Sequence, residues 1–413
     1  MIPVAMVLAA CGGTPGGGDD GADARGPDAT TAIDARADAP IDAARTVATV
    51  RVHYPAGART VSLRGSGGGL SWTAGAAMTA GADDTWTWSV DGLAETIELK
   101  PLLDDSTWAR GANYHLAPGQ TIELYPHFTS THGQVTVLAQ RFHSTALNDD
   151  RTIRAYLPPS YGENTRARYP VVYMHDGQNL FDPALAFGGV EWRVDEAFDA
   201  AGESGRCRDG ASCTNDGACG GGGGGVCATT REAIVIGIDN APDRIWELTP
   251  TVDSSVGDGG GADTYLRMIT TELKPMVDGM LRTAPGPADT AIVGSSLGGL
   301  VSAYAGVREP DVFGLVGALS PSTWWDDTVI IDDVAASAGA TPRPLRVYVD
   351  SGDSGPSRDD VTNTTALAQA YDDLGYTPGV DLEHVVQAGA SHNETYWAQR
   401  FPGAMAFLLG ARP

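Results

Sequence analysis

Between residues 47 and 125, apolar and polar side chains alternate in short runs that glycine- and aspartate-rich turns separate. A strand with one face on a core and the other in solvent has this period of two residues. Many short strands with frequent turns indicate a small all-β sandwich over residues 47–128. The runs that carry this prediction are 47–54, 59–63, 85–90, 96–100 and 121–125.

From about residue 134 the pattern changes to apolar, β-rich runs with helix-like stretches between them. Strands that alternate with helices predict an α/β domain with a mostly parallel central sheet, which we place at residues 129–413. Seven such strands suit an α/β-hydrolase core. The apolar runs are 152–157, 171–174, 233–238, 291–293, 315–319, 345–349 and 382–386, and helix-like stretches lie at 264–281, 297–307 and 364–374.

The first 46 residues have a different character. Residues 1–11 form a short apolar run that ends in Leu-Ala-Ala-Cys. This resembles the lipobox of bacterial lipoproteins, in which the cysteine, here Cys11, is lipidated. The basic region that opens a signal peptide is missing, so either the true start lies upstream or the likeness is accidental. Residues 12–46 are mostly Gly, Ala, Asp, Pro and Thr, which predicts a disordered acidic linker.

The net charge of the chain limits the classes of partner that it can bind. The 413-residue chain carries a net charge of −25, which repels nucleic acid and anionic membrane surfaces. It has no run of 18 or more apolar residues, about the length that a membrane-spanning helix requires. We therefore expect a protein of the cell envelope or extracellular space whose only membrane attachment is a lipid on Cys11.

A cysteine-rich insertion at residues 206–229 interrupts the α/β pattern. Its four cysteines surround a run of six glycines, Gly220–Gly225. In an exported protein, closely spaced cysteines of even number predict two disulfides with three possible pairings. Four thiolates binding one zinc ion is the rival interpretation. The cysteines are Cys207, Cys213, Cys219 and Cys227.

One apolar run ends in a Gly-x-Ser-x-Gly motif, residues 294–298, and a helix-like stretch follows it. This strand–turn–helix context is that of a nucleophile elbow, in which two glycines give room for a sharp turn. We predict Ser296 as the nucleophile. The backbone N–H of Leu297, at the start of the helix, would stabilise the oxyanion.

A serine nucleophile requires a base, and in α/β-hydrolases an acid and then a histidine follow the serine along the chain. His384 lies inside an apolar run and is predicted to be a strand residue. His392 lies in a loop just beyond the last strand, so we predict it as the base.

The acid that orients the histidine is expected in the loop after the strand at 345–349. Asp353 is the first choice because of its distance from the strand end. Asp350 lies close to the strand, and Asp359 or Asp360 could serve if the loop folds back.

The second oxyanion donor is expected in a loop after an early strand, and the backbone N–H of Gln178 is the candidate. His175 beside Asp176 suggests a metal, but nothing near them in the sequence completes a ligand set, so we predict neither metal nor cofactor. Trp324 and Trp325 follow the strand after the motif and either line a pocket or pack in the core.

Aromatic residues in the predicted sandwich raise a second kind of binding. Tryptophan rings can stack on sugar rings, although such residues more often belong to a core. The sandwich resembles the modules attached to carbohydrate-active enzymes. The tryptophans are Trp72, Trp86, Trp88 and Trp108.

Several motifs, in order along residues 134–410, resemble the putative-esterase family of α/β-hydrolases. Its members include enterochelin (ferric-siderophore) esterases, family-1 carbohydrate esterases such as feruloyl esterases, and mycolyltransferases. The resemblance implies Ser296 as nucleophile, His392 as base, and Leu297 and Gln178 as the oxyanion hole. The acid loop and the cysteine-rich insertion depart from the family pattern. The matching segments are 169–179, 237–240, Arg244 with Glu247, 294–299, and 392–394 with Trp397.

Together these patterns predict an exported serine esterase that cleaves a small ester of a sugar, a phenolic or a siderophore through an acyl-enzyme. Two alternatives stay open. An acyltransferase of the same fold would pass the acyl group to a sugar hydroxyl instead of water. A carbohydrate-binding lipoprotein would keep the fold without the reaction.

Overall fold

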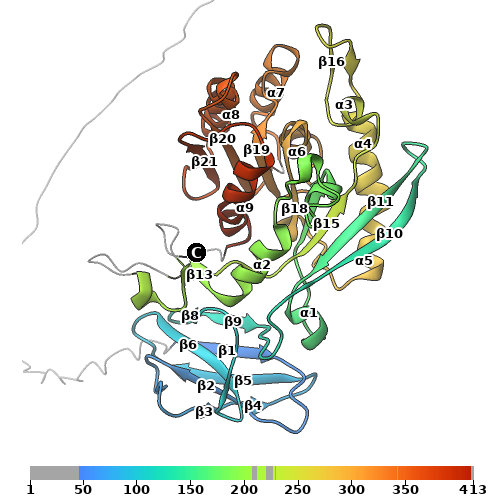
Figure 1. Ribbon diagram of the computed structural model, residues 1–413. Coiled ribbons are helices and arrows are strands. Elements are labelled where there is room, and N and C mark those ends of the chain that lie inside the picture. Colours follow the sequence, from blue (N-terminus) through green and yellow to red (C-terminus); the bar gives the residue numbers. More distant parts are fainter. Residues whose placement is uncertain (1–45, 207–211, 220–226, 228, 342, 411–413) are drawn as a thin grey trace, which may run out of the picture. The chain divides into compact units, whose positions relative to one another are not determined.

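The computed structural model describes residues 46–206, 212–219, 227, 229–341 and 343–410 of the 413 (Figure 1). All of them belong to one compact unit, 45–413. The predicted lipobox and residues 12–45 of the predicted linker lie outside the described residues.

The region after residue 46 forms two antiparallel-rich sheets, which confirms the predicted sandwich. One sheet has the order β4-β5-β1-β9, and the other has the order β3-β2-β6-β7 with β8 beside β6. The alternation in β1 places Ala48, Val50 and Val52 in the core between the sheets. The strands are β1 (Val47–His53), β2 (Val61–Gly65), β3 (Ala76–Ala77), β4 (Thr79–Ala80), β5 (Thr85–Asp91), β6 (Ile97–Leu103), β7 (Thr107–Trp108), β8 (Tyr114–Leu116) and β9 (Thr121–Leu124).

The rest of the chain forms a sheet of order β10-β11-β15-β12-β18-β19-β20-β21. In this spatial order, β15, β12, β18, β19, β20 and β21 each pair in parallel with the next strand. Strand β11 pairs antiparallel with both of its neighbours, β10 and β15. All seven predicted runs are strands of this sheet. The strands are β10 (Gln134–Ser144), β11 (Asp149–Leu157), β12 (Val171–His175), β15 (Ile234–Ile238), β18 (Thr290–Ser296), β19 (Leu315–Pro321), β20 (Arg346–Gly352) and β21 (Leu382–Gln387).

Strand β10 was absent from the prediction. It forms a long hairpin with β11, seen as the extended ribbon in Figure 1. The run Val135-Thr136-Val137-Leu138-Ala139 was a usable signal for it, although Val135 and Val137 are 40% and 42% exposed.

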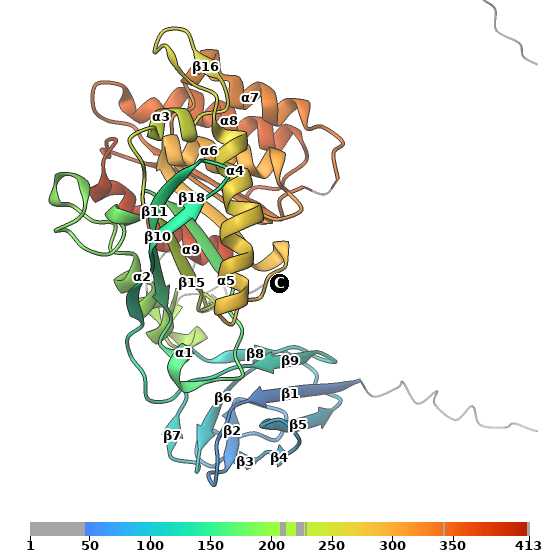
Figure 2. The same ribbon diagram turned by 90° about the vertical axis from the view of Figure 1, so that its right-hand side faces the viewer.

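Helices cover both faces of this sheet. Alternate residues of β12 point to opposite sides, so Val171 and Tyr173 join one core while Val172 and Met174 join the other. Helices α4 and α5 lie along the first face (Figure 2), and α2 and α9 pack on the second. The helices are α1 (Ser160–Glu163), α2 (Val194–Glu203), α3 (Arg244–Glu247), α4 (Ala262–Met268), α5 (Lys274–Met280), α6 (Leu297–Arg308), α7 (Trp325–Ala336), α8 (Val361–Asp373) and α9 (Glu394–Leu409). None of these helices in the described ranges is both long and apolar enough to cross a bilayer.

The cysteine-rich insertion packs against the sandwich. A disulfide joins Cys213 to Cys227, and Cys219 is also disulfide-bonded, which supports disulfides over a zinc site. The backbone N–H of Asn113 donates to the carbonyl of Thr214 at 3.0 Å. Cys207 lies outside the described residues.

One carboxylate of the α/β part makes several hydrogen bonds at its contact with the sandwich. Glu163, at the end of α1, accepts hydrogen bonds from the backbone N–H groups of Phe128, Thr129 and Ser130 at 2.7–3.0 Å. The hydroxyl of Tyr54 in the sandwich also donates to it, at 3.0 Å. Burial raises the pKa of Glu163, but the hydrogen bonds from the Thr129 hydroxyl, at 2.6 Å, and from the three backbone N–H groups outweigh burial and lower the pKa to about 2.

We expect Glu163→Ala to lower the free energy of unfolding by about 2–4 kcal/mol, because three backbone donors lose a charged acceptor. Urea denaturation at pH 7 measures the change. Glu95→Ala, at an exposed glutamate of the sandwich, is the control and should be nearly neutral. Equal stability of the two variants would contradict this account of the contact.

Candidate active site

The Gly-x-Ser-x-Gly motif forms a sharp turn between β18 and α6, as the sequence predicts. Ser296 adopts φ 57° and ψ −124°, a strained conformation for a residue with a side chain. The helix α6 begins at Leu297, so the first N–H groups of the helix lie directly beside the serine. This is the geometry of a nucleophile elbow.

The two motif glycines are required by close packing. A Cβ atom on Gly294 would lie 2.7 Å from Cδ2 of His175 and 2.8 Å from the carbonyl carbon of Gly298. A Cβ atom on Gly298 would lie 3.2 Å from the Cβ of His175. The turn is therefore pressed against the end of β12, and larger residues would force the strand and helix apart.

His175 packs against this turn. Each of its ring nitrogens has a polar partner in the protein, so neither is available to a metal. It is 2% exposed, and its ring nitrogens lie 2.9 Å from the Tyr265 hydroxyl and 3.2 Å from Ser302 Oγ. Burial lowers the pKa of His175 to about 4, so the imidazole is neutral at pH 7. The carboxylate of the neighbouring Asp176 binds the guanidinium of Arg244.

The predicted base has a carboxylate partner. His392 lies between β21 and α9, and its Nδ1 is 2.6 Å from Oδ1 of Asp359. Asp359 is buried and accepts hydrogen bonds from Ser320 Oγ at 2.7 Å and from the N–H of Gly352 at 2.5 Å. Burial raises the pKa of Asp359, but the bonds to His392, Gly352 and Ser320 lower it below the ordinary value.

This pairing corrects the first choice of acid. Asp353 lies before the loop folds back, and its carboxylate accepts from the N–H of Gly389 at 2.7 Å. Asp350 is the fifth residue of β20 and points into the core, where it is fully buried. Asp360 binds the Asn363 side chain at 2.9 Å. The loop folds back, which was one of the open alternatives. It brings the carboxylate of Asp359, and not that of Asp353, to Nδ1 of His392.

Residues at the end of strand β19 contact both Asp359 and Ser296. In the ladder between β18 and β19, Ser296 pairs with Pro321. Ser320, just before this proline, contacts Asp359, and Ser322, just after it, lies 3.3 Å from Ser296 Oγ. Ser296 and Asp359 therefore both contact the segment 320–322, at the carboxyl end of β19. Ser320 and Ser322 were not predicted, although the sequence Ser-Pro-Ser directly after an apolar run was a usable signal.

The predicted oxyanion loop is held next to the elbow. Strands β12 and β18 pair in parallel up to Met174 and Val293, so Gln178 follows its strand end much as Ser296 follows its own. A Cβ atom on Gly177 would lie 2.6 Å from the backbone of Gly237, so this glycine allows the loop to lie against β15.

Charged residues fix the conformation of this loop. Arg244 binds both carboxylate oxygens of Asp176, at 2.6 and 2.7 Å. The Asn240 amide donates to Asp176 at 2.9 Å, and its backbone N–H donates to the Gln178 side chain at 3.1 Å. Burial raises the pKa of Asp176, and the stronger effect of Arg244 lowers it. These contacts give a physical role to motif residues that the sequence matched only by resemblance.

The two predicted pocket tryptophans differ. Trp324 is 46% exposed and follows Ser322 by two residues, which suits a contact with substrate. Trp325 is 1% exposed, and its Nε1 donates to the carbonyl of Thr251, so it belongs to the core and not to a substrate pocket.

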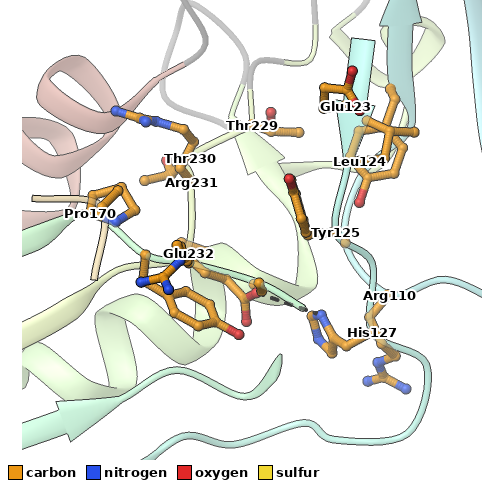
Figure 3. A pocket seen from close by; sticks show the side chains of 18 of the residues that line it. Arg110, Glu123, Leu124, Tyr125, His127, Pro170, Thr229, Thr230, Arg231 and Glu232 are labelled. Carbon is orange, nitrogen blue, oxygen red and sulfur yellow. Dashed lines mark ion pairs between the residues drawn. The ribbon is translucent and has the colours of Figure 1, made fainter. Parts of the chain in front are cut away.

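A cavity of about 370 Å³ lies away from this site (Figure 3). It is lined by sandwich residues such as Tyr125 and His127 and by residues that precede strands, such as Pro170 and Glu232. In Figure 3 His127 faces Glu232, at 3.8 Å. The catalytic candidates follow the strands instead, so this cavity is at the other edge of the sheet.

Comparison with known proteins agrees with the geometry. The family described as Esterase: Putative esterase matches residues 144–215 and 224–408, which is more than half of the chain.

Curated relatives include the uncharacterized protein YbbA of Bacillus subtilis, 25% identical over 63% of this chain and 93% of that protein. A siderophore triacetylfusarinine C esterase of Aspergillus fumigatus is 27% identical over 41% of this chain, and the match spans 50% of that enzyme. Among solved structures, the enterobactin esterase of Shigella flexneri has a TM-score of 0.47 and 15% identity, over 84% of this chain and 87% of that one.

His175 gives a test of the packing under the elbow. Unfolded histidine binds a proton near pH 6.5 and the folded residue near pH 4. The unfolded state therefore binds more protons between these values, so folding stability falls as the pH drops through this window. We expect the advantage of wild type over His175→Gln to shrink by about 3 kcal/mol between pH 7 and pH 4.

Urea denaturation at several pH values measures this difference. His143→Gln, at an exposed histidine, is the matched control and should change stability by less than about 1 kcal/mol throughout. A pH-independent difference for His175→Gln would contradict a neutral buried imidazole.

Proposed function

Because the chain belongs to the putative-esterase family and is a carboxylic ester hydrolase, we propose that it is a serine esterase with Ser296, His392 and Asp359 as its catalytic residues. The observation that carries this proposal is the strained elbow at Ser296, and it is supported by His392, whose Nδ1 lies 2.6 Å from the buried carboxylate of Asp359. The motif resemblance implies Ser296 and His392, and the contact with His392 supports Asp359 as the acid.

In this mechanism His392 takes the proton of Ser296 while Oγ attacks the ester carbonyl carbon. The carbonyl oxygen becomes an oxyanion, which the N–H groups of Leu297 and Gln178 stabilise. The C–O bond to the alcohol then breaks, and the alcohol leaves with the proton held by His392. Water, deprotonated by His392, cleaves the acyl-enzyme, releases the carboxylic acid and restores the serine.

Asp359 holds the imidazole by its Nδ1, which keeps the other nitrogen free for the serine. Its two further hydrogen bonds keep the carboxylate ionised, so that it stabilises the imidazolium formed during each step.

For the substrate we propose a small ester of a sugar, a phenolic or a siderophore. Relatives named as siderophore esterases support this class. The exposure of Trp324 supports a contact with an aromatic or sugar group of such a substrate. We also propose that the enzyme is exported, which the disulfide between Cys213 and Cys227 supports. Product analysis with added acceptor alcohols would separate hydrolysis from acyl transfer.

Hydrolysis of p-nitrophenyl acetate and butyrate tests the catalytic assignment. We expect Ser296→Ala to lower kcat/KM by about 10⁴-fold or more, and Asp359→Asn by about 10²- to 10⁴-fold. Asp353→Asn is the matched control and should stay within about threefold of wild type.

Circular dichroism would establish that each variant is folded. Equal turnover by wild type and Ser296→Ala would exclude the serine mechanism. A larger loss in Asp353→Asn than in Asp359→Asn would exclude Asp359 as the acid.

A second function is supported by the sandwich, for which we propose carbohydrate binding. Trp72 and Trp108 are 36% and 39% exposed, and their rings lie 6.3 Å apart with planes inclined by 31°. Arg64 fixes both, because its guanidinium lies 5.2 Å from the Trp108 ring and donates to the Trp72 carbonyl. By contrast, Trp86 and Trp88 pack against the sandwich core.

Polar groups surround this tryptophan pair. A cavity of about 480 Å³ beside it is lined by Glu98, Lys100 and Asn113 of the sandwich and by Thr214 and Asn215 of the disulfide-held insertion. Apolar ring faces next to amides and charged groups suit a pyranose, which presents C–H groups on its face and hydroxyls at its edge.

Affinity electrophoresis in gels containing xylan, mixed-linkage β-glucan or starch tests this function. We expect retardation in at least one polymer, weakened about tenfold or more by Trp72→Ala and by Trp108→Ala. Tyr125→Ala, at a 41% exposed aromatic of the same sandwich, is the control and should bind as wild type does. Migration unaffected by every polymer, or equal loss in all three variants, would exclude the tryptophan pair as a sugar site.

A further inference from the structure

Two buried charged residues next to the proposed triad have no part in the mechanism above. Asp350, in β20, is fully buried, and the Arg400 side chain, in α9, is only 4% exposed. Nε of Arg400 lies 2.9 Å from Oδ2 of Asp350. The other oxygen of Asp350 accepts from the N–H of Ser320 at 2.9 Å. Burial raises the pKa of Asp350, and the facing guanidinium opposes that rise.

Arg400 also reaches the proposed acid. Its Nη2 lies 3.9 Å from Oδ2 of Asp359 and donates to Ser320 Oγ at 2.7 Å. That hydroxyl in turn donates to the same oxygen of Asp359, at 2.7 Å. A continuous series of charged and polar contacts therefore runs from Asp350 through Arg400 and Ser320 to Asp359, and from there to His392.

The backbone at Ser320 is distorted to make these contacts. Ser320 has φ 38°, an unfavourable value for a residue with a side chain, at the end of a strand that is buried throughout. Such strain persists only where surrounding contacts fix it. Here the N–H of Ser320 binds Asp350 while its hydroxyl binds Asp359 and Arg400.

Arg400 is itself rigidly held. Its Nη1 donates to the Gln387 side chain of β21 at 3.1 Å, in addition to the contacts with β19 and β20. A planar guanidinium that is bound on three strands has little freedom, so it can define where Asp359 lies.

The charges of this group change during the proposed reaction. With a neutral imidazole, two carboxylates and one guanidinium leave one net negative charge in a buried environment. With an imidazolium the group is neutral. Because an unbalanced charge is costly away from water, this arrangement favours the protonated histidine that forms when Ser296 loses its proton.

We propose that Arg400 and Asp350 are positioning residues that hold Asp359 against His392 and set the charge balance under which His392 accepts the serine proton. This inference rests on the proposed serine esterase function. Arg400 disfavours the imidazolium through its positive charge and Asp350 favours it through its negative charge, so their removal should act in opposite directions.

Other charged groups near His392 stay unchanged in such variants. Asp360 follows the acid on the same turn and interacts electrostatically with His392, and Glu394 lies two residues after the histidine at the start of α9. On the remaining side the Trp397 ring meets the imidazole edge-on, with centroids 5.0 Å apart, and carries no charge.

The test is the pH profile of kcat/KM for p-nitrophenyl butyrate. We expect Asp350→Asn to move the acidic limit of activity down by about one pH unit, and Arg400→Gln to move it up by about one unit. The double variant, which removes one charge of each sign, should have a limit near that of wild type. Arg400→Lys keeps the charge and should keep the limit while lowering kcat, because it loses the bound geometry.

Single variants that leave an unpaired buried charge can fail to fold, and in that case the double variant tests the positioning role by its kcat, which should fall below that of wild type. Its matched control is Lys274→Gln with Asp278→Asn, a largely buried pair of opposite charge bound at 2.8 Å within α5. This control should leave the acidic limit and kcat unchanged. A second readout, independent of turnover, is the NMR titration of the His392 imidazole in the Ser296→Ala background, with each variant added.

Folded single variants Asp350→Asn and Arg400→Gln whose acidic limits both match wild type would overturn the charge role. Limits that move in the same direction for both single variants would do so as well. These outcomes differ from failure of the proposed function, in which Ser296→Ala would itself retain full turnover.

Discussion

The site depends on one tight contact, between the end of β12 and the turn at Ser296. The strained serine can be held only if β18 and α6 approach closely, and they approach closely only because Gly294 and Gly298 leave room for His175. His175 must in turn be neutral and hydrogen-bonded, since a charged imidazole in this position would be costly. Backbone strain at the nucleophile is thus balanced by packing and hydrogen bonds one layer below it.

The functional loops are fixed by polar contacts rather than by burial alone. Asp176 with Arg244 holds the proposed oxyanion loop, and Asp350 with Arg400 holds the strand end beside Asp359, the proposed acid. Each pair joins segments that are far apart in the sequence but follow neighbouring strands. Because the carboxyl ends of parallel strands meet at one edge, a few such pairs are enough to assemble the site.

Features formed by residues that are neighbours in the sequence could be predicted. Features that depend on contacts between distant segments could not. The elbow, its strand and its helix are contiguous, so Ser296 and Leu297 could be predicted from the motif. The acid could not be chosen, because β20 runs on to Gly352 and takes Asp350 into the core, and a turn at 358–360 then returns Asp359 to the histidine. For the same reason no pattern distinguishes exposed Trp324 from buried Trp325, or marks Arg400 on the last helix as a partner of Asp359.

Glu163 has a consequence for how the protein unfolds. This one carboxylate, on the first helix of the α/β part, accepts the backbone N–H groups of Phe128, the last residue of the sandwich, and of the two residues that follow it. Nearby, Asn164 donates to two further sandwich carbonyls. These bonds are directional, and many of their donors belong to the backbone, so neither part can loosen without leaving polar groups of the other unsatisfied. The two parts should therefore lose structure together, as one cooperative unit, although each has a core of its own.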